Sequence, residues 1–272
     1  MVYGFVRGFR RLWRIPAIIY YLLSQALIVR WQRRKMPSDP REQARFVTEQ
    51  TRNWALGLTR ILGIRLEWMG EGTVVPEDGG LVIANHQSYL DILVHASVGG
   101  MCFTPNTGIR NWFFLGWYVN QSNPVWIDRT TPAKAKKTLE EFRRVIDRGA
   151  ALLIYPEGTT TSGKVSLLPF KSTAFEAVCG TEKPIHMFLT HYEPDDARDA
   201  EVAWYDHTGF LKHVWRVLGN GSVRAVIVPL EPLIPGKSLT RKELAQQAYD
   251  CMQNAHNAYL TNRKPVQTPP SV

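Results

Sequence analysis

The fold is decided by one stretch of the chain, Leu81-Val82-Ile83-Ala84-Asn85-His86-Gln87-Ser88-Tyr89-Leu90-Asp91. It opens with four apolar residues in a row, and an apolar run without alternation is typical of a strand that is covered on both faces. We expect Ser88 to be the N-cap of a following helix, so that His86 lies in the strand-to-helix turn and Asp91 in the first helical turn. Open α/β sheets hold their sites at such strand ends. The stretch therefore predicts a fold class and a site together.

Similar apolar runs recur along the chain and alternate with helical patterns. The expected strands are Ile64–Met69, Leu81–Asn85, Met101–Thr104, Pro124–Ile127, Ala151–Tyr155, Pro184–Tyr192 and Val223–Leu230. Helices are expected from Thr131, an N-cap followed by Pro132, to Gly149, and again over residues 169–180. A last helix begins near Thr240, which has the capping-box spacing to Glu243. This alternation predicts an α/β domain with a mostly parallel central sheet flanked by helices.

The positive charge of the chain is concentrated at its N-terminus. Of 33 basic residues among the 272, eight lie in residues 1–35, which hold no acid, whereas the rest is nearly neutral with 25 bases and 24 acids. Between Arg14 and Arg30 runs an uncharged segment, Ile15–Val29, which is shorter than the ~20 residues that span a bilayer. A helix with aromatic and arginine flanks favours an anionic membrane surface. The alternative is a surface helix that covers the domain's own core.

The chain divides into three parts on these patterns. A second helix, from Pro40 to Gly63, follows the first, so residues 1–62 are expected to form a membrane-docking helical hairpin. Residues 63–262 are the expected catalytic domain, and the proline-rich residues 263–272 a disordered tail. A nucleic-acid-binding protein more often has its charge on the folded domain, so we expect no nucleic-acid partner. Three cysteines without a C-x-x-C spacing argue against a disulfide framework or a zinc ribbon.

The His86–Asp91 pair is the first candidate for chemistry. The sequence contains no G-x-S-x-G, G-x-x-x-x-G-K, G-x-G-x-x-G or H-E-x-x-H motif. A carboxylate at position 91 can accept a hydrogen bond from one imidazole nitrogen of His86 and leave the other as a base. Such a pair without a nearby serine is suited to deprotonating the hydroxyl of a substrate. The alternative is that Asp91 only completes a capping box and His86 is a surface residue.

Two further blocks follow expected strands. In Tyr155-Pro156-Glu157-Gly158-Thr159-Thr160-Thr161-Ser162-Gly163, proline and glycine predict a sharp turn whose N–H and hydroxyl groups can bind an anion. Leu168-Pro169-Phe170-Lys171 comes next and opens the expected helix. In Trp126-Ile127-Asp128-Arg129 an apolar strand ends in an Asp-Arg pair. The alternatives are a flexible Ser/Thr loop and a surface ion pair.

Together these blocks resemble the glycerolipid acyltransferase superfamily, which includes the lysophosphatidate (1-acylglycerol-3-phosphate) acyltransferases. The blocks of the family are matched in order by Asn85–Asp91 (N-H-x-S-x-x-D), Gly116–Arg129 (aromatic-I-D-R at its end), Tyr155–Gly158 with Leu168–Lys171 (F-P-E-G-T and L-P-F-K), and loosely Pro184–Tyr192. The resemblance covers residues 64–233. The basic N-terminal hairpin is also similar to the membrane-docking element of the family.

The resemblance implies a mechanism and a set of partners. His86, oriented by Asp91, would deprotonate a glycerol-type hydroxyl, which attacks the thioester of acyl-CoA or acyl carrier protein, while backbone donors near the helix start hold the oxyanion. Neither a metal nor another cofactor is implied. The implied substrate-binding residues are Arg129, Glu157, Gly158, Thr159, Thr160 and Lys171. The expected activity is acylation of 1-acylglycerol-3-phosphate to phosphatidic acid, at the cytoplasmic face of the inner membrane.

Three positions depart from the pattern of the family. Thr160 stands where an arginine usually follows E-G-T, Asn106 where a lysine usually precedes the second block, and Met187 where the fourth block often has a proline. The first two departures remove expected contacts to a phosphate. They favour, as an alternative acceptor, another lysolipid such as lyso-ornithine lipid. A catalytically inactive membrane scaffold is the alternative from another class, and the intact His86, Asp91 and Glu157 argue against it.

Overall fold

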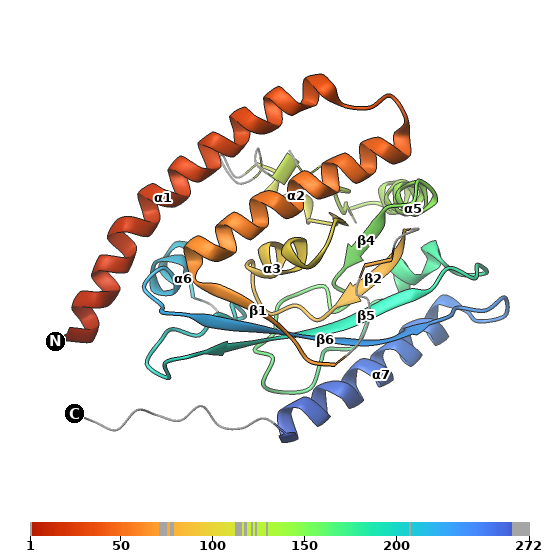
Figure 1. Cartoon of the computed structure of the whole chain (residues 1–272). Helices are drawn as coiled ribbons and strands as arrows, with labels where there is room; N and C mark the ends of the chain where they lie inside the picture. The colour runs from red at the N-terminus through yellow and green to blue at the C-terminus, as the bar shows by residue number, and fades with distance from the viewer. Residues whose placement is uncertain are drawn as a thin grey trace.

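The sheet lies at the centre of the molecule (Figure 1). The computed structural model describes residues 2–70, 75–76, 79–111, 116, 119–120, 122, 124–128, 130–206 and 208–262. Within these residues six strands form one sheet in the order β1-β6-β5-β2-β4-β3. Their bounds are Ile64–Trp68 (β1), Gly80–Ala84 (β2), Met101–Phe103 (β3), Ala151–Ile154 (β4), Ile185–Pro194 (β5) and Val223–Leu233 (β6). All neighbours pair in parallel except β5 and β6, so the predicted mostly parallel α/β sheet is confirmed.

Helices cover both faces of the sheet. One core combines even-numbered residues of β2, such as Val82 and Ala84, with α2 (Pro40–Leu62), α3 (Asp91–Val98) and α6 (Phe210–Val217). The other core combines Leu81 and Ile83 with α5 (Pro132–Asp147), the 3₁₀ helix η3 (Ser172–Ala177) and α7 (Arg241–Asn262). Consecutive residues of a strand point to opposite faces, which explains why β2 is buried at every position. The short 3₁₀ helices η1 (Arg33–Lys35) and η2 (Thr107–Ile109) lie in connections.

Two predicted elements are wrong. Residues 124–127 form no strand, and only an isolated parallel bridge joins Ile127 to Asn106. β3 has already ended at Phe103, and Pro105 accepts from the Ile127 N–H but has no N–H of its own to donate. The helix predicted over residues 169–180 is only η3, because the preceding backbone is held extended where the Lys171 N–H donates to the Pro156 carbonyl over 2.9 Å.

The N-terminal segment is a hairpin of two helices, α1 (Val2–Gln32) and α2 (Figure 1). α1 is 31 residues long, twice the predicted apolar segment, and it contains Pro16. It is long and apolar enough to cross a membrane by length and composition. The carboxylate of Asp39 caps α2, and Gly63 ends it with a φ of 75°. The predicted tail, residues 263–272, lies outside the described residues.

Four arginines on one face of α1 fasten this helix to the end of α6. We call Arg7, Arg10, Arg11 and Arg14 the arginine latch, because each donates to a backbone carbonyl between residues 215 and 221. Arg14 is only 4% exposed. The sequence assigned these charges to an anionic membrane surface, and the structure shows them bound to the helix end, where carbonyl groups lack intrahelical donors.

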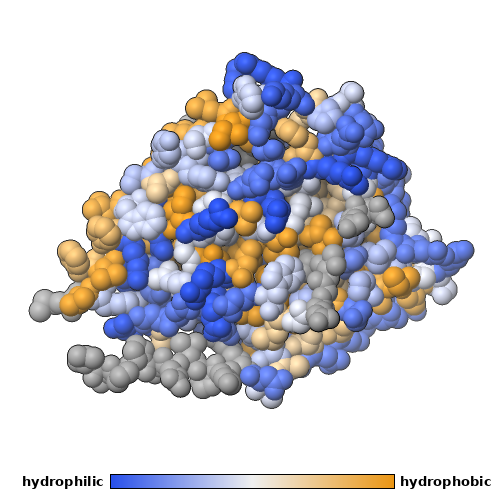
Figure 2. Space-filling model, in the orientation of Figure 1, coloured by the Kyte–Doolittle hydropathy of each residue, from blue (hydrophilic) through white to orange (hydrophobic). Residues whose placement is uncertain are grey.

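The opposite face of α1 is apolar and exposed. Its large side chains include Phe5 at 78%, Leu12 at 74% and Leu27 at 70% exposure. Figure 2 shows hydrophobic side chains along the upper-left edge of the molecule, where Figure 1 places α1. Exposed apolar area of this extent is unusual on a monomeric soluble protein and marks an interaction surface.

Candidate active site

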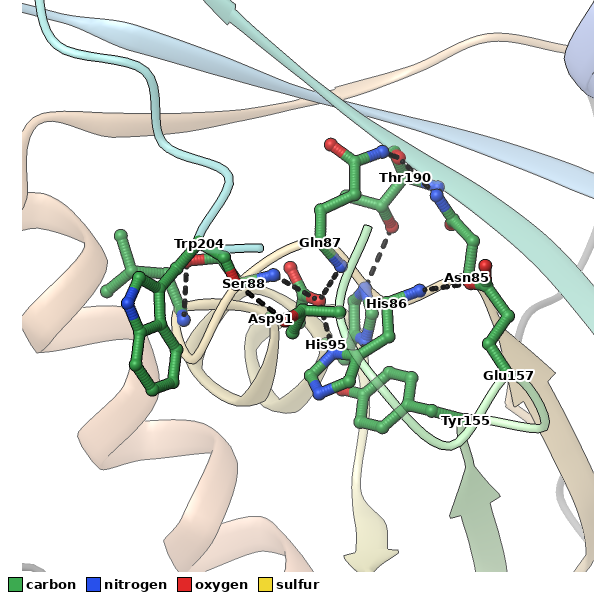
Figure 3. Close-up of polar contacts among 12 residues, drawn as sticks. Asn85, His86, Gln87, Ser88, Asp91, His95, Tyr155, Glu157, Thr190 and Trp204 are labelled. Carbon is green, nitrogen blue, oxygen red and sulfur yellow. Dashed lines mark hydrogen bonds and ion pairs between the residues drawn. The ribbon is translucent and has the colours of Figure 1, made fainter. Parts of the chain in front are cut away.

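His86 and Asp91 meet at the carboxyl end of β2 (Figure 3). The Nδ1 atom of His86 lies 2.7 Å from the Oδ2 atom of Asp91. The predicted positions in the turn and in the first helical turn are therefore right. The predicted N-cap is wrong, because α3 begins at Asp91 and its N-cap residue is Leu90. Asp91 itself accepts the N–H groups of Gln87 (2.7 Å) and Ser88 (3.0 Å), which folds the turn tightly around the carboxylate.

The environment of Asp91 keeps it ionised. Its side chain is 1% exposed, and burial works to raise its pKa. The hydrogen bond and the charge of His86, with the Ser88 N–H, outweigh burial and hold the pKa below its usual value. The second oxygen, Oδ1, accepts the phenol O–H of Tyr192 over 2.6 Å. A carboxylate in this setting is a fixed acceptor that selects the Nδ1–H tautomer of His86.

The other imidazole nitrogen of His86 is available for chemistry. The side chain is 20% exposed, and Nε2 has no hydrogen bond to any residue that the structure describes. With Nδ1–H donated to Asp91, Nε2 holds a lone pair. The Tyr155 ring stacks on the imidazole at a centroid distance of 4.0 Å and an interplanar angle of 8°. The ring is thus held on its edge by Asp91 and on its face by Tyr155.

A chain of buried hydrogen bonds holds the hydroxyl of Tyr155. The Nδ1 atom of His95 lies 2.8 Å from the Tyr155 hydroxyl, and its Nε2 atom lies 2.8 Å from the Thr190 hydroxyl. Burial lowers the pKa of His95 to about 4, so this imidazole is neutral near pH 7. Sequence reasoning missed His95 and Tyr192. The sequence offered one signal for Tyr192: it is the last residue of a predicted strand, as Asn85 is, and sites lie at strand ends.

Glu157 joins the two site loops to each other. Its carboxylate accepts the His86 N–H at one oxygen (2.9 Å) and the Leu168 N–H at the other (3.0 Å). The residue is 2% exposed, and burial raises its pKa even though the two backbone donors oppose the shift. This contact set positions the backbone of His86. The predicted contact of Glu157 with an acceptor stays a prediction.

Gly158 and Lys171 lie against each other beside Glu157. Gly158 has a φ of 73°, and a Cβ atom there would collide with the side-chain amine of Lys171. The glycine is required by its backbone conformation, whereas the flexible end of the Lys171 side chain could move aside for a Cβ atom. Lys171 is exposed, so its amine can reach a ligand at this edge of the sheet.

The threonine loop packs against the segment around Trp204. The Thr160 hydroxyl donates to the Trp204 carbonyl over 2.5 Å. The backbone N–H of Trp204 donates to the Gln87 carbonyl over 2.7 Å. The hydroxyl of Thr160 is thus used within the protein, whereas Thr159 is exposed. Arg129 lies outside the described residues. Its neighbour Asp128 accepts the Thr130 hydroxyl and has its pKa lowered to about 2 by Thr130 and Lys134.

The expected oxyanion donors near the helix start are not all available. The N–H groups of Gln87 and Ser88, which lie nearest to His86 in sequence, both donate to Asp91. The Leu90 N–H donates to the Ser88 hydroxyl over 3.3 Å. Asp91 and Ser88 use these three groups to shape the turn, and the expectation that backbone donors near the helix start hold the oxyanion stays a prediction.

An apolar cavity of about 320 Å³ lies beside the turn. Its wall includes Tyr89 and Leu90, three and four residues after His86. The rest of the wall comes from α1, α2, α3, α6 and the segments between elements, through side chains such as Leu22, Leu58 and Val214. Such a cavity suits a hydrocarbon chain, because its apolar wall shields the methylene groups of the chain from water.

Comparison with known proteins places this geometry in context. The profile of the family described as Acyltransferase matches residues 65–188. The chain is 29% identical over 218 residues to the lyso-ornithine lipid O-acyltransferase of Pseudomonas aeruginosa, covering 80% of this chain and 81% of that protein. It is 33% identical over 196 residues to the lyso-ornithine lipid O-acyltransferase of Rhodobacter capsulatus, covering 68% and 67%.

Two further proteins connect the chain to another acceptor and to a solved structure. It is 30% identical over 182 residues to the 1-acyl-sn-glycerol-3-phosphate acyltransferase of Neisseria meningitidis, covering 66% of this chain and 68% of that protein. The crystal structure of the 1-acyl-sn-glycerophosphate acyltransferase of Thermotoga maritima superposes with a TM-score of 0.71 over 97% of this chain and 99% of that one. At 16% identity this second likeness concerns the fold.

Proposed function

The chain belongs to the glycerolipid acyltransferase family and is an acyltransferase of lysolipids, and from this premise we propose that His86 is its general base. The Nε2 atom takes the proton of the acceptor hydroxyl while the hydroxyl oxygen bonds to the thioester carbonyl carbon. The tetrahedral intermediate then expels the thiolate, which receives the proton from the imidazolium. The products are an ester and a free thiol, and no acyl-enzyme is formed.

One observation supports this mechanism above all others. The buried Asp91 carboxylate lies 2.7 Å from Nδ1 of His86, which leaves the lone pair of Nε2 at the partly exposed end of the ring. A kinetic assay tests the role: thiol release from acyl-CoA and from acyl carrier protein is followed with a panel of lysolipids. Transfer by a His86→Ala variant within tenfold of the natural protein would exclude His86 as the base.

For the acceptor we favour lyso-ornithine lipid over 1-acylglycerol-3-phosphate. A phosphomonoester usually recruits several cations. Thr160 directs its hydroxyl to the Trp204 carbonyl, and Asn106 uses its side-chain oxygen to cap its own turn at Gly108. Among the residues that the structure describes, the cationic side chain beside Gly158 is that of Lys171. The likeness to the Neisseria enzyme keeps 1-acylglycerol-3-phosphate as the second candidate.

A comparison of the two acceptors decides between them. We expect kcat/KM for lyso-ornithine lipid to exceed that for 1-acylglycerol-3-phosphate by at least tenfold in mixed micelles. Lys171→Met should lower the rate with the phosphomonoester more than the rate with lyso-ornithine lipid. Lys137→Met, an exposed lysine on α5, is the matched control. A preference for the phosphomonoester would reverse the assignment.

We further propose that the enzyme works on a membrane surface, at its cytoplasmic face, with a hydrocarbon chain in the apolar cavity. The exposed apolar face of α1 supports membrane contact. The latch holds the opposite face of α1 against the folded body, which favours a helix that lies along the membrane. Ile18 and Leu22 of α1 line the cavity, so the same helix adjoins both the lipid and the site.

A further inference from the structure

Tyr192 contacts the His86–Asp91 pair from a neighbouring strand. It lies near the end of β5, on the same face as Phe188 and Thr190. Its phenol donates to Oδ1 of Asp91 over 2.6 Å. No block of the sequence pattern assigned this residue a role.

The bond from Tyr192 differs in kind from the other bonds that Asp91 accepts. Oδ2 accepts from His86, Gln87 and Ser88, all in the turn that leads into Asp91 itself. Those three donors move together with the carboxylate. Among the described residues, Tyr192 is the donor to Asp91 that comes from another element, so it ties the carboxylate itself to β5.

We propose that Tyr192 is a positioning residue for His86 and that it acts through Asp91. This rests on the proposed role of His86 as the base. A phenol that donates to Oδ1 fixes the plane of the carboxylate, and hence the direction in which Nε2 points. It also draws electron density from the carboxylate, which weakens the attraction of Asp91 for a protonated imidazole.

The surrounding titratable groups do not replace Tyr192. From α3, His95 faces Asp91, and the ring of Tyr155 faces it from the end of β4. Glu157 bonds the His86 backbone, and Tyr89 interacts with Tyr192. Burial raises the pKa of Tyr192 well above its usual value, so the phenol remains a donor at every pH at which the enzyme is assayed.

The Tyr192→Phe variant tests the proposal, because it removes one oxygen and keeps the ring. We expect kcat to fall about fivefold to tenfold with KM within twofold. We also expect the acid limb of the kcat profile to move up by about 0.5–1 pH unit. Without the phenol hydrogen bond, the Asp91 carboxylate attracts a protonated imidazole more strongly.

A matched control separates positioning from general damage. The Tyr259 phenol donates over 2.6 Å to Glu193, a buried carboxylate on the same strand but on the other face of the sheet. Tyr259→Phe should lower the melting temperature at least as much as Tyr192→Phe and leave the acid limb in place. An equal shift of the acid limb in both variants would overturn the proposal.

A double-mutant cycle shows whether Tyr192 acts through Asp91. In an Asp91→Asn background, Tyr192→Phe should change the remaining rate by less than twofold. Independent, multiplying losses would overturn the proposal. NMR titration of the His86 imidazole gives a readout without turnover. Its midpoint should rise in Tyr192→Phe and not in Tyr259→Phe, and an unchanged midpoint would refute the proposed coupling even if no lysolipid were accepted.

Discussion

Replacing Arg14 by methionine tests whether the arginine latch holds α1 on the body of the protein. Methionine keeps an unbranched apolar stem but removes every donor. Arg14 donates to the carbonyl oxygens of Asn220 (2.7 Å), Leu218 (3.1 Å) and Gly221 (3.4 Å). The substitution removes the guanidinium donor of these three carbonyl oxygens, while α1 still covers them and keeps water away.

The expected loss follows from these bonds. A hydrogen bond to a charged group is worth about 1.5–3 kcal/mol, and the bond at 3.4 Å is weak. Burial lowers the pKa of Arg14, which shows that bringing the charge inside has its own cost. We therefore expect a net loss of about 2–3 kcal/mol. With an unfolding entropy of about 2.1 cal/mol/K per residue, this lowers the melting temperature by about 3.5–5 °C.

Circular dichroism of the full chain in detergent micelles measures the effect. Arg30→Met is the control, because Arg30 is an exposed residue of the same helix and the change in charge is the same. The control should lose less than about 1 kcal/mol, which is the usual value of a cation near a helix C-terminus. Equal melting temperatures for the two variants would mean that the latch does not stabilise the fold.

Four other outcomes are expected. His86→Ala should abolish transfer with little loss of stability, and Asp91→Asn should reduce kcat by several orders of magnitude; a residual rate within tenfold contradicts both roles. Glu157→Gln should lower kcat about 10–100-fold yet barely change the melting temperature. Removing a buried charge stabilises the fold, whereas an amide donor that faces a backbone N–H destabilises it, so the two effects offset each other. A large drop in melting temperature would point to a purely structural role. His95 has a lowered pKa of about 4, so protonation favours the unfolded chain below pH 6.5. Stability should fall by about 2 kcal/mol from pH 7.5 to pH 5 on its account, and urea unfolding of His95→Gln should show a smaller fall. Deleting residues 1–35 should abolish flotation with anionic liposomes, and equal flotation would show that another surface binds the membrane.

The sequence was most informative where chemistry and backbone are adjacent along the chain. His86 and Asp91 are five residues apart, so strand-end and helix-start patterns sufficed to predict their contact. Tyr192 meets Asp91 from 101 residues away, and a single tyrosine at a strand end predicts no such bond. The apolar pattern also underestimated α1, because the latch arginines interrupt it at helical spacing. Only the partner carbonyls of residues 215–221 explain why charges occupy one face of an otherwise apolar helix.

The latch joins parts of the chain that are made at very different times. Arg14 and its acceptor at Asn220 are 206 residues apart, and synthesis proceeds at about 5–20 residues per second. For about 10–40 s the completed α1 therefore has its apolar face formed while the segment that binds its arginines has not yet been translated. In that interval a nearby bilayer is a better partner for the helix than water is. With the membrane role proposed above, α1 would then meet the lipid surface before the latch closes and before the active site is complete.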